Sequence, residues 1–301
     1  MIINKIRKLL LKIIKKGAIE NKKNIRRVFL EEKNLENKGL GITAKKYFNE
    51  EVIVSLTTYS IRINTVHLVV ESLFQQLIKA NKIVLWLDKN EFKNIEDVPI
   101  ALIRMQERGL EIKFYDNIKS YKKLIPTLKE YPNQIIITVD DDIMYPIDFI
   151  EKLLNNYKKN SKRIYYYKGS SIGYEKRKVL SYKKWGNKND NLLLNFPTGV
   201  GGVLYPPNCF HSEILNEKKF MELCPKGDDI WFKVMSLLKN TECQQIISDN
   251  FEENFLAIDS TQKITLYENN VLNGENDIQI AKVFNEYQIL DKLNKIVEGM
   301  K

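Results

Sequence analysis

Three consecutive aspartates, Asp140, Asp141 and Asp142, directly follow the apolar run 135–139. Adjacent carboxylates repel one another, and a strand end tolerates them most readily when a cation neutralises them. Carboxylate and phosphate oxygens are the ligands that Mg²⁺ and Mn²⁺ prefer. In an extended segment alternate side chains share a direction, so we expect Asp140 and Asp142 to hold an ion while Asp141 points elsewhere. An acidic helix-capping turn is the alternative interpretation.

A second acidic pair, Asp228 and Asp229, opens the amphipathic segment 228–239, which predicts a helix. One of the two is expected to be the N-cap of that helix, which contributes about 1 kcal/mol. Because a cap needs only one acid, the other is available for chemistry.

The segments that must position these acids alternate between short β-branched runs and stretches of helical period from Glu51 onward. The predicted strands are apolar almost throughout, as strands are when both faces of a sheet are covered. This pattern indicates an α/β fold with a mostly parallel central sheet flanked by helices. We predict strands at 52–57, 83–88, 110–116, 135–140 and 163–168, and helices at 65–79, 97–108, 120–131, 146–160, 228–239 and 275–297.

Several further side chains lie where ligands bind in such sheets, which is beyond the carboxyl ends of the strands. Thr57, Tyr59 and Arg62 follow the first predicted strand, and Asp88 ends the second. Lys122 and Lys123 open a predicted helix beside the same edge. Each has an ordinary alternative role as surface charge or turn residue.

A glycine-rich segment, 197–207, allows the backbone to approach a ligand closely because its glycines lack a Cβ atom. It contains Thr198, Gly199, Gly201 and Gly202. The spacing is not that of a G-x-G-x-x-G dinucleotide loop. A tight bulge without a functional role is the alternative.

Taken together, these segments resemble the GT-A class of nucleotide-sugar glycosyltransferases, and specifically a bacterial surface-polysaccharide, family 2-like branch. The resemblance covers roughly residues 50 to 290. It rests on the segments 54–62, 72–76, 83–88, 121–126, 136–146, 197–206 and 227–232.

The resemblance implies a Rossmann-like GT-A fold and a sugar transfer from a nucleotide-diphosphate donor, with a UDP-sugar favoured, to a glycan or lipid-linked acceptor. It divides the chain into a basic N-terminal segment (1–48), a nucleotide-sugar-binding half (49–145) and an acceptor-binding half (146–301). It implies Mn²⁺ or Mg²⁺ held by Asp140 and Asp142, with His211 as a further ligand. The remaining implied donor contacts are Thr57, Tyr59, Arg62, Asp88, Lys123, Asp140 and Asp141, and the implied sugar and acceptor pocket is formed by Thr198, Gly199, Gly201 and Gly202.

By the same resemblance, Asp229, or less favourably Asp228, would act as the general base of an inverting transfer. A metal-dependent nucleotidyltransferase using the same carboxylates, and a non-catalytic membrane-associated scaffold, are the alternatives.

The positive charge of the chain is concentrated at its N-terminus. Residues 1–27 contain ten basic residues and one acid, whereas the remainder contains 38 basic and 37 acidic residues. We therefore expect no nucleic-acid partner. At 100° per residue the isoleucines and leucines of 2–14 fall mostly on one side, which predicts a basic amphipathic helix lying on an anionic membrane surface. Packing of this helix on the body is the alternative.

The three cysteines, Cys209, Cys224 and Cys243, lack the spacing of a zinc site or disulfide framework. No run of 18 apolar residues is present. We therefore expect a cytoplasmic protein attached peripherally to the inner face of the membrane, with a role in envelope polysaccharide synthesis.

Overall fold

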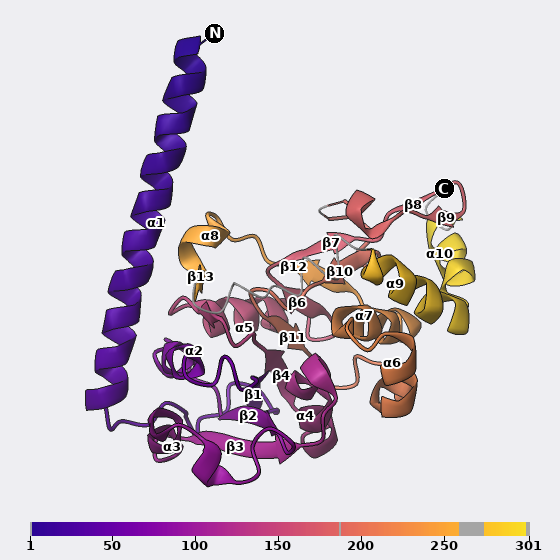
Figure 1. Ribbon diagram of the computed structural model, residues 1–301. Helices are drawn as coiled ribbons and strands as arrows, with labels where there is room; N and C mark the ends of the chain where they lie inside the picture. The colour runs from indigo at the N-terminus through magenta and orange to yellow at the C-terminus, as the bar shows by residue number, and fades with distance from the viewer. Residues whose placement is uncertain (1, 187, 259–273, 299–301) are drawn as a thin grey trace.

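A seven-stranded sheet with helices on both faces forms the centre of the protein (Figure 1). The computed structural model describes residues 2–186, 188–258 and 274–298, with side chains from Ile13 onward. The strand order is β12-β6-β11-β4-β1-β2-β3, and all strands run parallel except β11. The predicted α/β class is confirmed. The strands of this sheet are β1 (Val52–Thr57), β2 (Lys82–Asp88), β3 (Leu110–Tyr115), β4 (Ile135–Thr138), β6 (Ile164–Tyr166), β11 (Val203–Tyr205) and β12 (Cys243–Gln245).

Three two-stranded sheets lie at the periphery of the main sheet. They pair β5 (Ile143–Met144) with β13 (Leu256–Ala257), β7 (Gly169–Ser171) with β10 (Asn195–Pro197), and β8 (Tyr174–Glu175) with β9 (Lys178–Val179). The first follows the aspartate triplet, and the other two belong to the segment between β6 and β11.

Ten α-helices and four 3₁₀ segments are present in the described part of the chain. The helices are α1 (Ile2–Glu36), α2 (Val66–Phe74), α3 (Ile100–Gln106), α4 (Ile125–Glu130), α5 (Phe149–Lys159), α6 (Glu217–Leu223), α7 (Asp228–Leu238), α8 (Phe251–Asn254), α9 (Glu275–Glu286) and α10 (Ile289–Glu298). The 3₁₀ segments are η1 (Ile95–Asp97), η2 (Lys119–Lys123), η3 (Tyr182–Lys184) and η4 (Ser212–Leu215).

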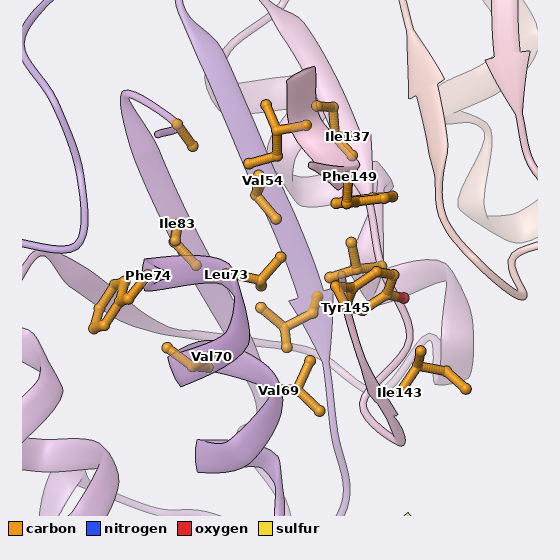
Figure 2. Packing of buried hydrophobic residues seen from close by; sticks show 14 of the residues in the cluster. Val54, Val69, Val70, Leu73, Phe74, Ile83, Ile137, Ile143, Tyr145 and Phe149 are labelled. Carbon is orange, nitrogen blue, oxygen red and sulfur yellow. The ribbon is translucent and has the colours of Figure 1, made fainter. Parts of the chain in front are cut away.

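The apolar strands arise because each face of the sheet is covered by helices. Along β4, Ile135 and Ile137 pack in one core cluster and Ile136 packs in the other. Figure 2 shows the first cluster, in which α2 presents Leu73 toward the side chain of Val54. A strand buried on both faces has no polar alternation, which is why the sequence pattern identifies it.

Three predicted helices differ from the observed ones for identifiable reasons. The predicted helix 65–79 ends at Phe74. Just beyond it, the side-chain amide of Gln76 donates to the carbonyl oxygens of Ser72 and Pro146. The predicted helix 120–131 is divided into η2 and α4 at Leu124, two residues before Pro126, which lacks the amide hydrogen that a continuous helix would need there. The predicted helix 275–297 is two helices, because Gln288 adopts a left-handed conformation with φ of 50°.

Helix α1 continues to Glu36, beyond the predicted basic segment. Leu30 and Asn34 are buried where it meets the body. Nearer the N-terminus, Lys15 forms a 2.9 Å ion pair with Glu253 in α8. Figure 1 shows the N-terminal part of α1 extending beyond the body. No helix among the described residues is long and apolar enough to cross a membrane.

Candidate active site

The carboxyl ends of the parallel strands bring acidic side chains from two distant segments together. Asp140, Asp141 and Asp142 follow β4, while Asp228 and Asp229 form the first turn of α7. Lys123, at the end of η2, connects the two groups: its Nζ lies 3.4 Å from Asp140 Oδ1 and 3.0 Å from Asp228 Oδ2. We call these five aspartates with Lys123 and Arg62 the carboxylate cluster.

Arg62 supplies the second positive charge of the cluster. Its Nη1 atom lies 2.7 Å from Asp141 Oδ1 and 3.0 Å from Asp142 Oδ2. Asp141 also accepts a 2.7 Å hydrogen bond from the Thr58 hydroxyl. The expectation that Asp141 points away from Asp142 is therefore wrong, because both contact Arg62, whereas Asp140 pairs with Lys123.

The carboxylate cluster contains more acidic than basic groups. Five aspartates face one lysine and one arginine, a formal charge of −3 if every carboxyl group is ionised. Burial, followed by the charge of Asp140, raises the pKa of Asp142 to about 7, although Arg62 opposes the shift. Such an excess of negative charge at a strand end is what a bound cation would neutralise.

Asp140 and Asp142 fit a divalent ion that takes few protein ligands. Among the residues whose positions are described, no group of three or more His, Cys, Asp or Glu side chains is arranged to hold a metal. Mg²⁺ and Mn²⁺ sites commonly use one or two carboxylates and complete the coordination with water and substrate phosphates. The two aspartates are therefore the residues that would hold the ion together with a diphosphate.

Asp229, the predicted general base, is held by the glycine-rich segment. Its Oδ2 atom accepts a 3.2 Å hydrogen bond from the amide of Gly199. Burial, followed by the charge of Asp228, raises the pKa of Asp229 to about 7, and Lys123 opposes this rise. Asp229 as a residue is partly exposed, and a carboxyl group with a pKa near neutrality is suited to accept a proton from a substrate hydroxyl.

Lys123 remains charged in this environment. Burial lowers the pKa of its ammonium group, but the charges of Asp228, Asp140 and Asp229 outweigh burial and raise the pKa well above its ordinary value. The cation is thus fixed between the strand-end aspartates and α7. It can offset negative charge that develops on a bound phosphate.

Gly199 lies close to the side chains of Lys123 and Asp140. A Cβ atom at this position would lie 2.6 Å from Lys123 Nζ and 3.2 Å from Asp140 Oδ1. Gly201 and Gly202 have φ of 86° and 88°, which L side chains rarely adopt. The glycine-rich segment therefore combines a turn at 201–202 with a close backbone approach to the carboxylate cluster at Gly199.

The predicted N-cap role of Asp228 or Asp229 is wrong. Gly227 is the N-cap of α7, and no side chain at that position accepts a capping hydrogen bond. Both aspartates lie inside the first turn. Their oxygens are engaged by Lys123 and by the Gly199 amide instead. Negative charge in the first turn still interacts favourably with the helix dipole.

The other predicted donor-site residues, and Thr198 of the predicted sugar and acceptor pocket, have defined partners. Thr57 donates to the carbonyl oxygen of Trp86 at 2.8 Å, and the Tyr59 ring lies beneath the Arg62 guanidinium. Asp88 is buried 3.2 Å from Lys122 Nζ. Thr198 donates its amide to the Lys168 carbonyl.

His211 is not brought into the carboxylate cluster. It follows β11, which runs opposite to β4 and so leads away from the edge that holds Asp140. Its Nδ1 atom accepts from the Glu213 amide at 3.3 Å, and its own amide donates to Met235, two turns along α7 from Asp229.

Two contributors were missed by the site prediction. The Thr58 hydroxyl anchors Asp141, and the Tyr145 hydroxyl accepts a 2.9 Å hydrogen bond from the Asp140 amide. Both lie within the segments 54–62 and 136–146 that carry the resemblance, but their types gave no indication of these contacts.

Comparisons with known proteins were made for the whole chain. No protein-family profile and no curated protein sequence matches it. Among solved structures, it is similar to TarS 1-349 of S. aureus, with 14% identity, a TM-score of 0.45, and coverage of 66% of this chain and 58% of that one. It is also similar to the mannosyltransferase PcManGT of Pyrobaculum calidifontis in complex with GDP-Man and Mn²⁺, with 14% identity, a TM-score of 0.32, and coverage of 52% and 45%.

A third similar structure is a 4-diphosphocytidyl-2C-methyl-D-erythritol synthase, with 6% identity, a TM-score of 0.40, and coverage of 71% of this chain and 95% of that one. The chain spans about half the length of TarS 1-349 and of PcManGT. At these identities and TM-scores, the likenesses assign no activity or substrate to the chain.

Replacing Asp229 with Asn should stabilise the protein. Because the folded-state pKa of Asp229 is raised to about 7, the folded state keeps a proton that the unfolded state loses near pH 4, and stability falls as pH rises between these values. Asp229→Asn removes this loss. We expect Tm at pH 8 to rise by about 2–4 °C per kcal/mol regained, with no gain near pH 4, as measured by calorimetric scans.

Asp228→Asn is the matched control for this prediction. Asp228 is the ion-pair partner of buried Lys123, so its neutralisation should lower Tm at pH 8. Equal changes in the two variants would contradict the assigned difference between these neighbours.

Proposed function

We propose that the protein is a metal-assisted, GT-A-type glycosyltransferase that moves a sugar from a nucleoside-diphosphate donor to a hydroxyl group of a glycan or lipid-linked acceptor. The observation that carries the proposal is the carboxylate cluster, in which a candidate general base and a candidate phosphate site meet at the carboxyl edge of the sheet.

In this mechanism Asp229 removes the proton of the acceptor hydroxyl as its oxygen attacks the anomeric carbon. The glycosidic bond to the donor phosphate breaks, and the nucleoside diphosphate departs with the electron pair. One base and one displacement give inversion at the anomeric carbon. Asp140 and Asp142 would hold a divalent ion, which when bound would supply charge stabilisation for the leaving diphosphate.

The other residues of the cluster have supporting roles in this proposal. Arg62 orients Asp142 and Asp141, and Thr58 fixes Asp141 from the loop after β1. Lys123 holds Asp140 and Asp228 in place and faces the leaving group with a permanent positive charge. Asp88 and Lys122, paired at the end of β2, are suited to contact the nucleoside.

The finer parts of the proposal rest on the sequence. A UDP-sugar as donor and a place in bacterial envelope polysaccharide synthesis follow from the resemblance of the motifs to that branch. His211 is not included in the proposed metal site, because Asp140 and Asp142 lie at the opposite end of β11.

Metal-dependent donor binding tests the proposal directly. Calorimetry should show that UDP binds only with Mn²⁺ present, and that Asp142→Asn abolishes this binding because one of two ion ligands is lost. Asp116→Asn, a change at an exposed acid outside the cluster, should bind as the unmodified chain does. Unaltered UDP affinity in Asp142→Asn would refute the metal site.

The released product separates the proposed reaction from nucleotidyl transfer. Free nucleoside diphosphate identifies glycosyl transfer, whereas pyrophosphate identifies the other reaction. Absence of any turnover across a panel of sugar nucleotides would leave a binding protein instead of an enzyme.

The base assignment predicts a pH profile. Because the pKa of Asp229 is about 7, kcat/KM should rise with pH and level off above about 7. Asp229→Asn should lower kcat by about 10²–10⁴-fold and leave the Kd for UDP with Mn²⁺ nearly unchanged. A variant that retains transfer with an unshifted profile would exclude Asp229 as the base.

We also propose that α1 attaches the protein to the cytoplasmic face of an anionic membrane. Ile14, Ile25 and Val28 are about two-thirds exposed or more, and at 100° per residue they fall on the side of α1 opposite the buried Leu30. The helix therefore keeps an apolar stripe free while its other side meets the body. This arrangement, together with the lysines of residues 1–27, is that of an interfacial helix.

Vesicle binding tests this attachment. Ile14→Asn, Ile25→Asn and Val28→Asn combined should reduce co-sedimentation with phosphatidylglycerol vesicles at least about tenfold, because three apolar side chains no longer enter the acyl boundary. A control with Leu40→Asn, Leu77→Asn and Ile100→Asn changes side chains of similar exposure elsewhere. Equal loss in both variants would argue against α1 as the membrane contact.

A further inference from the structure

A second concentration of positive charge lies within the body of the protein. Residues 168–188, which we call the basic insertion, contain seven lysines and arginines and one acid, a net charge of +6. The local excess of positive charge is not apparent from the near-equal totals of acidic and basic residues outside residues 1–27. The remaining residues of the body are consequently acidic in balance.

The segment that contains the basic insertion leaves the sheet and returns beside the candidate active site. It leaves the sheet after β6, at the carboxyl edge, and the chain returns through β10. There the amide of Thr198 donates to the carbonyl oxygen of Lys168 at 3.0 Å. The next residue, Gly199, donates its amide to Asp229. Thr198, which bonds to the start of the insertion, is therefore the direct chain neighbour of the residue that bonds to the proposed base.

The insertion is a packed unit. The Trp185 ring lies 5.0 Å from that of Tyr182 and 5.1 Å from that of Phe196 in β10, and the Trp185 indole donates to the Leu180 carbonyl at 2.9 Å. These contacts use the aromatic side chains for packing. The β8–β9 hairpin lies near α10 (Figure 1), to which Arg177 is joined by its ion pair with Glu298. The charged side chains are left to point outward.

The outward lysines have few acidic partners. Lys168, Lys176, Lys178, Lys184 and Lys188 are exposed, and within the described ranges none of them forms an ion pair with a carboxylate. Lys168 lies over the ring of Phe251, and Arg177 pairs with Glu298. An exposed cluster of one sign attracts a ligand of the opposite sign.

The insertion and α1 differ in their exposed apolar side chains, and this difference indicates which kind of anionic ligand each would bind. Ile13 and Ile14 of α1 are 59% and 66% exposed. Among the described residues of the insertion, no large apolar side chain is exposed. A surface with charge but no apolar side chains to insert fits an anionic chain in water, whereas interfacial helices need both.

We propose that the basic insertion binds an acidic polysaccharide acceptor, whose successive carboxylate or phosphate groups contact its lysines and guide a chain hydroxyl toward Asp229. The proposal rests on the proposed function and names the class of acceptor for it. Several weak contacts along one chain act together, so the affinity falls as salt screens them.

The test compares two variants that lose the same charge. The insertion variant combines Lys176→Gln, Lys178→Gln and Lys184→Gln. The control combines Lys158→Gln, Lys159→Gln and Lys162→Gln, which are exposed lysines before β6, at the opposite end of the sheet. Binding of fluorescent polygalacturonate to the full chain is measured by anisotropy at two salt concentrations, with neutral dextran as a second probe.

We expect the insertion variant to bind polygalacturonate about tenfold more weakly, with a shallower salt dependence, and the control to change less than about twofold. Neither variant should bind dextran. Equal weakening in both variants would show a general charge effect and overturn the proposal. Tighter binding of duplex DNA than of polygalacturonate would overturn it as well, as would loss of phosphatidylglycerol vesicle binding with unchanged polymer binding.

UDP binding with Mn²⁺ separates this proposal from the function on which it rests. The insertion variant should keep the UDP affinity of the unmodified chain, and a parallel loss would assign the insertion to the donor instead. Absence of UDP binding in the unmodified chain would refute the proposed function, while the polymer result would still report on the insertion alone.

Discussion

The excess of carboxylates around Lys123 is the constraint on which the rest of the site depends. Five aspartates converge on one lysine and one arginine, and no single segment of the chain supplies them. The parallel sheet brings the end of β4 to one edge, and α7 delivers its first turn to the same place. Gly199 has no side chain because Lys123 and Asp140 occupy the space beside it. Burial, and after it the charges of neighbouring aspartates, raise the pKa values of Asp142 and Asp229.

Much of this arrangement could be predicted because its signals are local. Ile135 to Ile137 are apolar on both faces, so the strand and the parallel sheet follow from the residues themselves. Acids directly after such a strand must lie at its carboxyl edge. The contacts between segments could not be predicted, since the type of Arg62 does not reveal that it pairs with Asp141, and the start of α7 did not reveal that Gly227 is its N-cap. His211 was placed by resemblance, but the reversed direction of β11 carries it away.

The distribution of charge shows how composition can mislead when it is averaged over a long segment. The total outside residues 1–27 is nearly balanced, yet seven basic side chains gather in residues 168–188 and five aspartates gather in the cluster. The two regions have opposite signs and are joined at Thr198. A donor diphosphate and an anionic acceptor would otherwise repel one another, and separate cationic groups for each reduce that repulsion.

The junction at Lys168 and Thr198 has an evolutionary consequence. A segment that leaves and rejoins the fold at hydrogen-bonded neighbours can change in length or sequence without altering the pairing of β6 with β11. Replacement of this segment in a related chain could thus change the acceptor, while the residues proposed to bind the donor stay the same.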